Sequence, residues 1–212
     1  MRNLSLSDRL LDELQHGLNT SHVRPAASAR AYPANDVTDG ELDEHEIAHI
    51  AGLMRVNNAG EVAAQGLYRG QAIGARAEAL GASMQQAAQE ENEHLNWCQR
   101  RLAELNRRRS LLDGVWYWGS FTIGALAGAV GDKWSLGFVK ETEQQVCAHL
   151  DHHLERLPPQ DKRSRAIIDT MREDESRHAE SAADAGAAEL PAPVKAAMTL
   201  VSKVMTFTAY RI

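Results

Sequence analysis

The chain has 212 residues, enough for one domain with a sizeable core. Its formal net charge of −6 offers no electrostatic basis for binding nucleic acid. Its two cysteines, Cys98 and Cys147, lack the CxxC spacing of a structural zinc or rubredoxin-like iron site, and they are interpreted as reduced, core-filling thiols of a cytosolic protein.

The first expected element is a short amphipathic helix over residues 3–18. Its acidic residues argue against a secretory signal or a mitochondrial transit peptide. Residues 20–40 are rich in Ala, Pro, Ser and Asn, a composition that predicts a mobile or irregularly packed linker. We therefore expect an N-terminal helix and linker over residues 1–40 and a single larger domain over residues 41–212.

Helical periodicity, caps and helix breakers predict six further helices. A capping box, Thr38-x-x-Glu41, opens the first of them, and three arginines from Arg107 to Arg109 are expected to complement the negative end of the second. No segment shows the alternation of a strand, so the sequence predicts an all-α protein. The expected ranges are 39–79, 83–109, 115–130, 135–157, 161–185 and 192–209.

The most apolar stretch covers residues 115–130. As a helix it would rise about 24 Å, short of the ~30 Å hydrocarbon core of a bilayer, so a full span is not expected. Trp116 and Trp118, with cations nearby, suit a membrane interface. A buried crossover between two helical hairpins explains the segment equally well. For the apolar C-terminal helix over residues 192–209, contact with a membrane and packing against the bundle are equally good explanations.

Two Glu-x-x-His pairs occupy helix faces that are expected to be buried: Glu91 with His94, and Glu175 with His178. Residues three apart in a helix project from one face. A carboxylate on a buried face is costly unless its charge is compensated, and a metal ion is the usual compensation. These pairs therefore predict metal ligands.

Two further Glu-x-x-His pairs lack this context. Prolines interrupt the connection between the pair at Glu13 and the pair at Glu46. His49 lies about 18 Å from Glu61 along one helix, too far for a shared site. We therefore expect no metal at either pair.

Each selected pair follows a single glutamate on an earlier helix that also falls at a core position. Glu61 and Glu143 are 82 residues apart, and the two pairs are 84 residues apart, which indicates a duplicated helical hairpin. Two such hairpins supply four carboxylates and two imidazoles, the ligand set of a di-iron or di-manganese site inside a four-helix bundle. The six predicted ligands are Glu61, Glu91, His94, Glu143, Glu175 and His178.

The motifs resemble those of the demethoxyubiquinone hydroxylase family, the di-iron monooxygenases of ubiquinone biosynthesis. The resemblance covers residues 41–212, and Asn58 stands where this family is expected to have histidine. Because Asn58 lies off the helix face that carries Glu61, little effect on metal binding is expected. The resemblance rests on the run Arg-Val-Asn-Asn-Ala-Gly-Glu that ends at Glu61, Tyr68 seven residues later, Glu91-x-x-His94-Leu95, Glu143 with His149 six residues later, and Glu175-x-x-His178.

This resemblance implies a ferritin-like four-helix bundle with two additional apolar, membrane-facing helices. It also implies hydroxylation of the benzoquinol ring of a polyprenyl demethoxyubiquinol, with two iron ions, O2 and electrons derived from NADH. Such an enzyme would lie peripherally on the cytoplasmic side of the cell membrane. Eukaryotic members act with a lipid-binding accessory protein, so this kind of protein, or other ubiquinone biosynthesis proteins, are candidate partners.

Further residues have expected roles around the ligands. Glu90 and Asp174 lie four residues before the two ligand histidines and are candidate acceptors for the imidazole N–H groups, although Glu90 is almost as well explained as a surface acid. Tyr68 and His149 are candidates for relaying protons or electrons, with a satisfied core residue as the alternative for each. The bridging ligands are expected among Glu91, Glu143 and Glu175. Residues expected at the membrane or the substrate entrance are Trp116, Trp118 and Phe121.

Three other functions would use parts of the same pattern. A ferritin-type ferroxidase or iron-storage protein needs the same ligands, but its polar outer shell fits the apolar helices poorly. A di-iron hydroxylase acting on tRNA would need a basic face. A non-catalytic helical scaffold on a membrane would leave the six positions as buried polar residues, and iron analysis distinguishes it from an enzyme.

Overall fold

The structure is a computed structural model that describes residues 6–23, 25, 30–74 and 78–212. The described residues form seven helices and no strand, which confirms the predicted all-α class. None of these helices combines the length and the apolar character needed to cross a bilayer. The helices are α1 (Leu6–His22), α2 (Glu44–Gly74), α3 (Glu78–Glu104), α4 (Asp113–Val130), α5 (Asp132–Arg156), α6 (Lys162–Asp184) and α7 (Ala192–Ala209).

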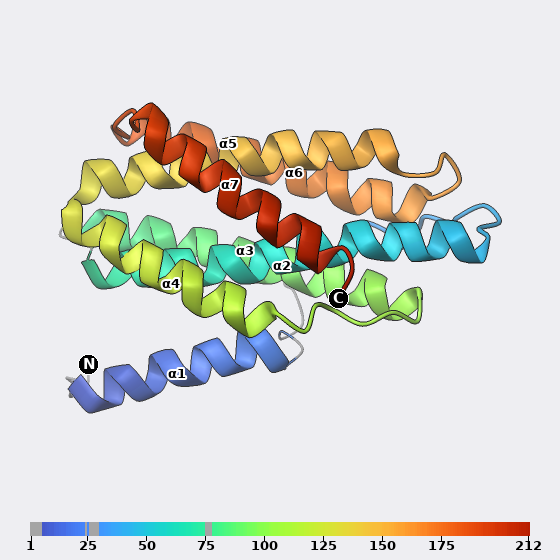
Figure 1. Cartoon of the computed structure of the whole chain (residues 1–212), viewed down its shortest axis with the longest axis horizontal. Helices are drawn as coiled ribbons and strands as arrows, with labels where there is room; N and C mark the ends of the chain where they lie inside the picture. The colour runs from blue at the N-terminus through green and yellow to red at the C-terminus, as the bar shows by residue number, and fades with distance from the viewer. Residues whose placement is uncertain (1–5, 24, 26–29, 75–77) are drawn as a thin grey trace.

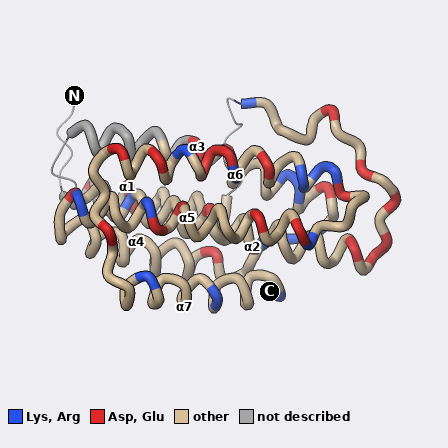
Figure 2. Tube along the Cα trace, turned by 90° about the horizontal axis from the view of Figure 1, so that it is seen from above, with Lys and Arg blue, Asp and Glu red and all other residues tan. Residues whose placement is uncertain are grey.

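Four of the helices form the bundle. The hairpin of α2 and α3 lies against the hairpin of α5 and α6, and α4 connects the two hairpins while packing along α2 (Figure 1). Helix α7 crosses the outside of α2 and α5, and α1 packs against α4. In the turned view of Figure 2, α7 and α3 lie on opposite sides of the molecule. The duplicated hairpin predicted from the spacing of the glutamates therefore corresponds to the two halves of the bundle.

The apolar core and the acidic residues share the same helix faces. On α2, Ile50, Leu53 and Met54 are buried in the main core cluster together with residues of α3, α5 and α6. Continuing along α2 at intervals of three and four residues, the same face carries Asn57 and Glu61. Packing of this apolar stripe therefore brings the glutamates of all four helices into the centre of the bundle.

Glycines allow α4 to lie unusually close to α2. A Cβ atom added at Gly66 would lie 2.3 Å from the carbonyl oxygen of Tyr117, and one added at Gly70 would lie 2.1 Å from that of Phe121. From the other side, a Cβ atom at Gly124 would lie 2.2 Å from the carbonyl oxygen of Leu67. Only glycine fits these positions, so the two backbones are in direct contact.

Several helix ends differ from the expected positions. Helix α2 begins at Glu44, and its reciprocal capping box is formed by Asp43 and Glu46, five residues after the predicted one. Helix α3 starts earlier than expected, at Glu78, and ends at Glu104. Asn106 adopts a left-handed conformation with φ of 54°, which stops the helix before the arginine triplet. The arginines therefore lie in the connection to α4 and do not complement the end of α3.

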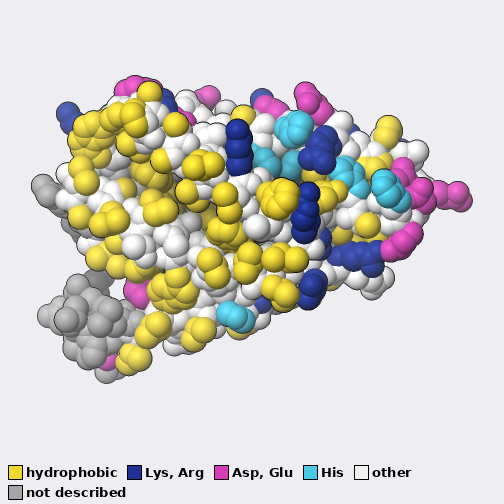
Figure 3. All heavy atoms as spheres, in the orientation of Figure 1, with side chains coloured by type: hydrophobic (Ala, Val, Ile, Leu, Met, Phe, Trp, Pro, Cys, Tyr) yellow, Lys and Arg dark blue, Asp and Glu magenta, His cyan; other side chains and the backbone are white. Residues whose placement is uncertain are grey.

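Apolar side chains remain exposed on the outer helices. They gather over α4 and α7 on the face shown in Figure 3, with cationic side chains beside them. Trp116, Trp118 and Phe121 are only half-exposed, because they pack inward against clusters that include Val56, Val62 and Tyr117. The exposed large apolar residues of α4 and α7 are Val115, Ile123, Leu126, Val130, Val194, Leu200, Val201, Val204 and Phe207.

Candidate metal centre

The structure brings all six predicted ligand residues together at the centre of the bundle. They form two overlapping groups, in each of which the potential ligand atoms lie within 4.8 Å of one another. Glu91 and Glu175 belong to both groups, a position that suits carboxylates bridging two ions. The first group is Glu61, Glu91, His94 and Glu175, and the second is Glu91, Glu143, Glu175 and His178.

The chemistry of these groups fits a pair of divalent cations. All four carboxylate side chains are buried, so their charges cannot be compensated by water. Glu61 Oε2, Glu91 Oε1 and His94 Nδ1 are buried and make no hydrogen bond within the described part of the chain. The charges of two divalent ions would balance those of four carboxylates. Buried nitrogen and oxygen atoms that lack a hydrogen bond are the atoms expected to coordinate a metal.

The electrostatics of the cluster show how much the carboxylates need compensating charge. Burial and the neighbouring charge of Glu91 raise the pKa of Glu61 well above its usual range, and burial with the charge of Glu175 does the same for the pKa of Glu143. Burial opposes protonation of His94, but the hydrogen bond with Asp174 and the nearby carboxylate of Glu175 still raise its pKa well above the usual range. Without cations the cluster therefore retains protons, and binding of metal would release them.

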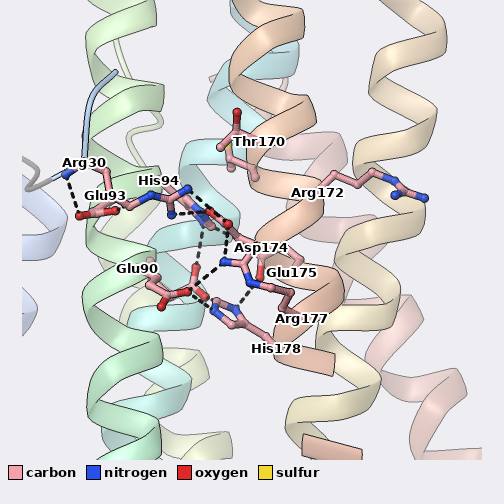
Figure 4. Close-up of polar contacts among 12 residues, drawn as sticks. Arg30, Glu90, Glu93, His94, Thr170, Arg172, Asp174, Glu175, Arg177 and His178 are labelled. Carbon is pink, nitrogen blue, oxygen red and sulfur yellow. Dashed lines mark hydrogen bonds and ion pairs between the residues drawn. The ribbon is translucent and has the colours of Figure 1, made fainter. Parts of the chain in front are cut away.

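Each imidazole is oriented by a carboxylate outside the cluster. His94 Nε2 lies 2.8 Å from Asp174 Oδ2, and His178 Nε2 lies 2.8 Å from Glu90 Oε2 (Figure 4). The Nδ1 atoms point the other way, 3.1 Å and 3.0 Å from Glu175 Oε1 and Oε2 respectively. The two outer carboxylates predicted from the sequence thus lie where they can fix both rings with Nδ1 toward a metal.

Tyr68 contacts Glu143 directly, whereas His149 lines the cavity that also contains Glu143. The buried Tyr68 hydroxyl donates a hydrogen bond to Glu143 Oε1. His149 is mostly buried and lines the cavity next to the cluster, with its ring centroid 3.9 Å from that of His153. Burial lowers the pKa of His149 to about 4, so this ring is neutral at physiological pH. A neutral imidazole and a phenol are both able to exchange protons with a bound substrate.

An apolar cavity of about 320 Å³ connects the carboxylates with the outer helices. Glu61, Glu91, Glu143 and Glu175 lie at one end of it, and Met198, Val201 and Met205 of α7 line the other end. Because Val201 is exposed, the α7 end of the cavity lies at the surface of the molecule. Helix α4 contributes Ser120 and Ile123 to the lining, whereas the structure does not bring the predicted entrance residues Trp116, Trp118 and Phe121 to it.

The two rejected Glu-x-x-His pairs have other partners. Glu13 forms an ion pair with Arg69, at 2.7 Å, which attaches α1 to α2. Glu46 completes the capping box of α2, and His49 Nδ1 lies 2.7 Å from the Tyr210 hydroxyl oxygen. Neither pair lies in the two potential metal groups found among the described residues.

Sequence reasoning missed two arginines beside the centre. Arg30 and Arg177 each lie 2.6 Å from a carboxylate oxygen of Asp174. Arg177 could have been expected, because it lies three residues after Asp174 on the same helix. Arg30 is 144 residues away in a segment without helical periodicity, and no pattern in the sequence connects it with the site.

The comparisons with known proteins agree with this centre. The family described as "Ubiquinone biosynthesis protein COQ7" matches residues 48–209. A protein of Chromobacterium violaceum named 3-demethoxyubiquinol 3-hydroxylase is 56% identical over 205 residues, which are 97% of this chain and 99% of the relative. Proteins of the same name from Nitrosococcus oceani and Dechloromonas aromatica are 53% and 52% identical, covering 99% and 96% of this chain and 98% of each relative.

Proposed function

The chain belongs to the family of the ubiquinone biosynthesis protein COQ7, and we propose that it hydroxylates a polyprenyl demethoxyubiquinol with two iron ions, O2 and electrons derived from NADH. In this reaction one oxygen atom of O2 enters the quinol ring and the other leaves as water. The observation that carries the proposal is the pair of overlapping Glu/His groups at the end of an apolar cavity. Relatives at more than half identity bear the name of the same hydroxylase.

The proposed ligands divide evenly between the two ions. Glu61 and His94 would hold one ion, Glu143 and His178 would hold the other, and the shared pair Glu91 and Glu175 would bridge them. When bound, the two irons supply the redox chemistry that activates O2. One imidazole and several carboxylate oxygens per ion leave coordination positions free for that co-substrate.

The cavity explains how a water-insoluble quinol reaches the centre. Its apolar walls exclude water and suit the quinol ring, while its exposed end at α7 lets the polyprenyl tail remain outside. The apolar face of α4 and α7 would lie on the membrane that dissolves the substrate, without spanning it. This arrangement supports a peripheral membrane location, and the cytoplasmic side remains an expectation from the family resemblance. His149 lines the same cavity as Glu143, and a neutral imidazole there can accept a proton from the quinol.

The iron-storage alternative has less support. A storage shell presents polar outer surfaces to water, whereas α4 and α7 carry nine large apolar residues on their exposed surfaces. The named relatives are hydroxylases, and their identity extends over nearly the whole chain. Iron loading followed by size-exclusion chromatography would reveal a large iron-filled assembly if storage were the function.

The test is iron quantitation on anaerobically reduced protein, followed by addition of O2 and a demethoxyquinol. We expect about two irons per chain and formation of the hydroxylated product. Glu143→Ala should lose both, because it removes a ligand from a buried site with a fixed charge balance. Full iron occupancy or full product formation in this variant would contradict the proposed ligand set.

A further inference from the structure

Arg30 connects α3 and α6 directly beside the proposed metal centre. Its guanidinium Nη1 lies 2.6 Å from Asp174 Oδ2, the atom that also contacts His94 Nε2 at 2.8 Å. Its backbone N–H donates to Glu93 Oε1 at 3.2 Å, and its guanidinium carbon lies 5.0 Å from the ring centroid of Trp97. Arg30 thus contacts α3 on both sides of His94, and it contacts α6 at the carboxylate that orients His94. Figure 4 shows Arg30 with Glu93 and Asp174.

The chain that follows Arg30 is anchored along the bundle. Residues 30–40, here called the strap, contain no helix, but Tyr32 and Ala34 are buried in the main core. Asp39 accepts hydrogen bonds from Arg101 of α3, at 2.7 Å, and from the backbone N–H of Arg163 of α6, at 2.9 Å. The strap therefore spans the α3–α6 side of the bundle and holds Arg30 at a defined place.

The two imidazoles differ in the charge around their outer carboxylates. Asp174 receives two guanidinium groups, because Arg177 Nη2 lies 2.6 Å from Oδ1 while Arg30 contacts Oδ2. Glu90 is the partner of His178. Among the described residues, the guanidinium group paired with Glu90 is that of Arg177, at 3.8 Å, which is beyond hydrogen-bonding distance. An arginine that pairs with a carboxylate fixes the orientation of the carboxylate and partly neutralises the negative charge of the carboxylate. Asp174 is thus the more tightly oriented of the two acceptors, and its charge is the more closely neutralised.

We propose that Arg30 is a positioning residue which, through Asp174, sets the orientation and donor strength of His94 and makes the two metal ions inequivalent. The hydrogen bond from a ligand imidazole to an outer carboxylate strengthens the imidazole as a donor. Because two arginines neutralise Asp174, His94 would donate its electron pair to a metal ion more weakly than His178 would. Arg30 lies outside residues 48–209, the part that matches the family model, although the named relatives align over nearly the whole chain.

This inference rests on the proposed function, and Mössbauer spectroscopy of the anaerobically reduced, ⁵⁷Fe-loaded protein tests it without any turnover. We expect two quadrupole doublets for the wild-type protein. Glu90→Gln, which alters the partner of His178, identifies the doublet of the ion on that side. Arg30→Gln should shift the other doublet, because Asp174 regains its negative charge. It should also weaken binding of the ion held by His94 about tenfold, because His94 loses its fixed orientation, and this loss is at the lower end of the effect of removing an outer partner of a metal ligand.

Two further variants separate positioning from general loss of structure. The first is Arg100→Gln. The side chain of Arg100 is 44% exposed, against 39% for Arg30, and it lies over Tyr32 of the strap without reaching Asp174. This variant should leave both doublets and both affinities unchanged. Arg30→Lys keeps the charge without the two-pronged contact and should give an intermediate shift.

The results that would overturn the inference are distinct from those that would overturn the function. Suppose that the wild-type protein binds two irons. Arg30 does not position His94 if Arg30→Gln then leaves both doublets unchanged, shifts both of them, or shifts only the doublet that Glu90→Gln also shifts. A wild-type protein that fails to bind two irons would overturn the proposed function, and this inference with it.

Discussion

At the residue scale, Glu143 accepts a hydrogen bond from the Tyr68 hydroxyl, which is not itself a proposed ligand. Tyr68→Phe should keep about two irons per chain, because the phenol is not needed for binding. We expect product formation to fall roughly tenfold, since a hydrogen bond to a charged group contributes about 1.5 kcal/mol and here fixes the carboxylate. Iron analysis and turnover on the same sample test this. Loss of iron, or unchanged turnover, would contradict it.

Asp113 gives the folded protein a pH dependence that is separate from the metal centre. Its side chain at the start of α4 is only 1% exposed, and it accepts a hydrogen bond from Asn58 at 3.1 Å. Burial raises the pKa of Asp113 to about 6 although Arg109 lies nearby. The position that departs from the family's expected histidine, Asn58, therefore has a structural partner in the connection between the hairpins.

The direction of the pH effect follows from this raised pKa. At pH values between 3.8, the ordinary pKa of an aspartate, and about 6, the folded chain holds a proton on Asp113 that the unfolded chain has lost. Stability from this group is therefore fully present at low pH and is lost as pH rises to about 6, by about 3 kcal/mol in all. The Asp113→Asn variant does not lose this stability as pH rises. Its free energy of unfolding minus that of the wild type, measured with urea, should therefore increase by about 3 kcal/mol from pH 4 to pH 7. A difference that stays constant with pH would contradict the prediction.

The residues of the centre differ in how far the sequence could identify them. Glu61, Glu91, Glu143 and Glu175 could be selected because each interrupts an apolar helix face, and the structure brings them together. The arginine partners of Asp174 could not be selected in the same way. Arg30 acts through a strap whose path depends on tertiary contacts such as those of Asp39, and these leave no period in the sequence.

At the element scale, the number and order of the helices could be predicted, because long apolar stripes fix which segments are helical. The ends could not be placed as well. Thr38 and Asp43 both begin plausible capping boxes, and only the second is used, since residues 38–40 belong to the strap. The close contact of α2 with α4 was not predicted either, because glycines inside helices weaken a helix pattern without showing what lies beside them.

The glycine contact between α2 and α4 predicts a large difference between two similar substitutions. Gly124→Ala would place a Cβ atom 2.2 Å from the carbonyl oxygen of Leu67, and backbone atoms cannot move aside easily. We expect a loss of about 1–3 kcal/mol in the free energy of unfolding. Gly119→Ala on the same helix meets nothing within 4 Å and should be neutral or stabilise by up to about 1 kcal/mol. Equal effects in urea unfolding would show that the two helices are not in close contact.

At the scale of the whole molecule, the cavity and the apolar face form one arrangement. The proposed metal centre lies deep in the bundle, and the cavity leads from it to α7, whose outer surface is apolar. Helix α6 lies on the side of the bundle away from α7 (Figure 2). A protein that collected its substrate from water would not need an apolar surface at the mouth of its cavity. The arrangement therefore supports the proposed contact of α4 and α7 with the membrane.

This assignment predicts that charge on α4 impairs substrate collection without impairing the chemistry. Leu126 is 66% exposed on the apolar face, and a buried charge there would cost about 2 kcal/mol at a membrane interface, less than at the bilayer centre. Leu126→Glu should keep its iron, bind lipid vesicles more weakly, and lose activity roughly tenfold on a long-tailed quinol but not on a short-tailed one. Ala183→Glu, on the exposed surface of α6, is the matched control and should change none of these. An equal loss of activity on both quinols would place the defect in the centre itself and contradict a role of this face in reaching the membrane.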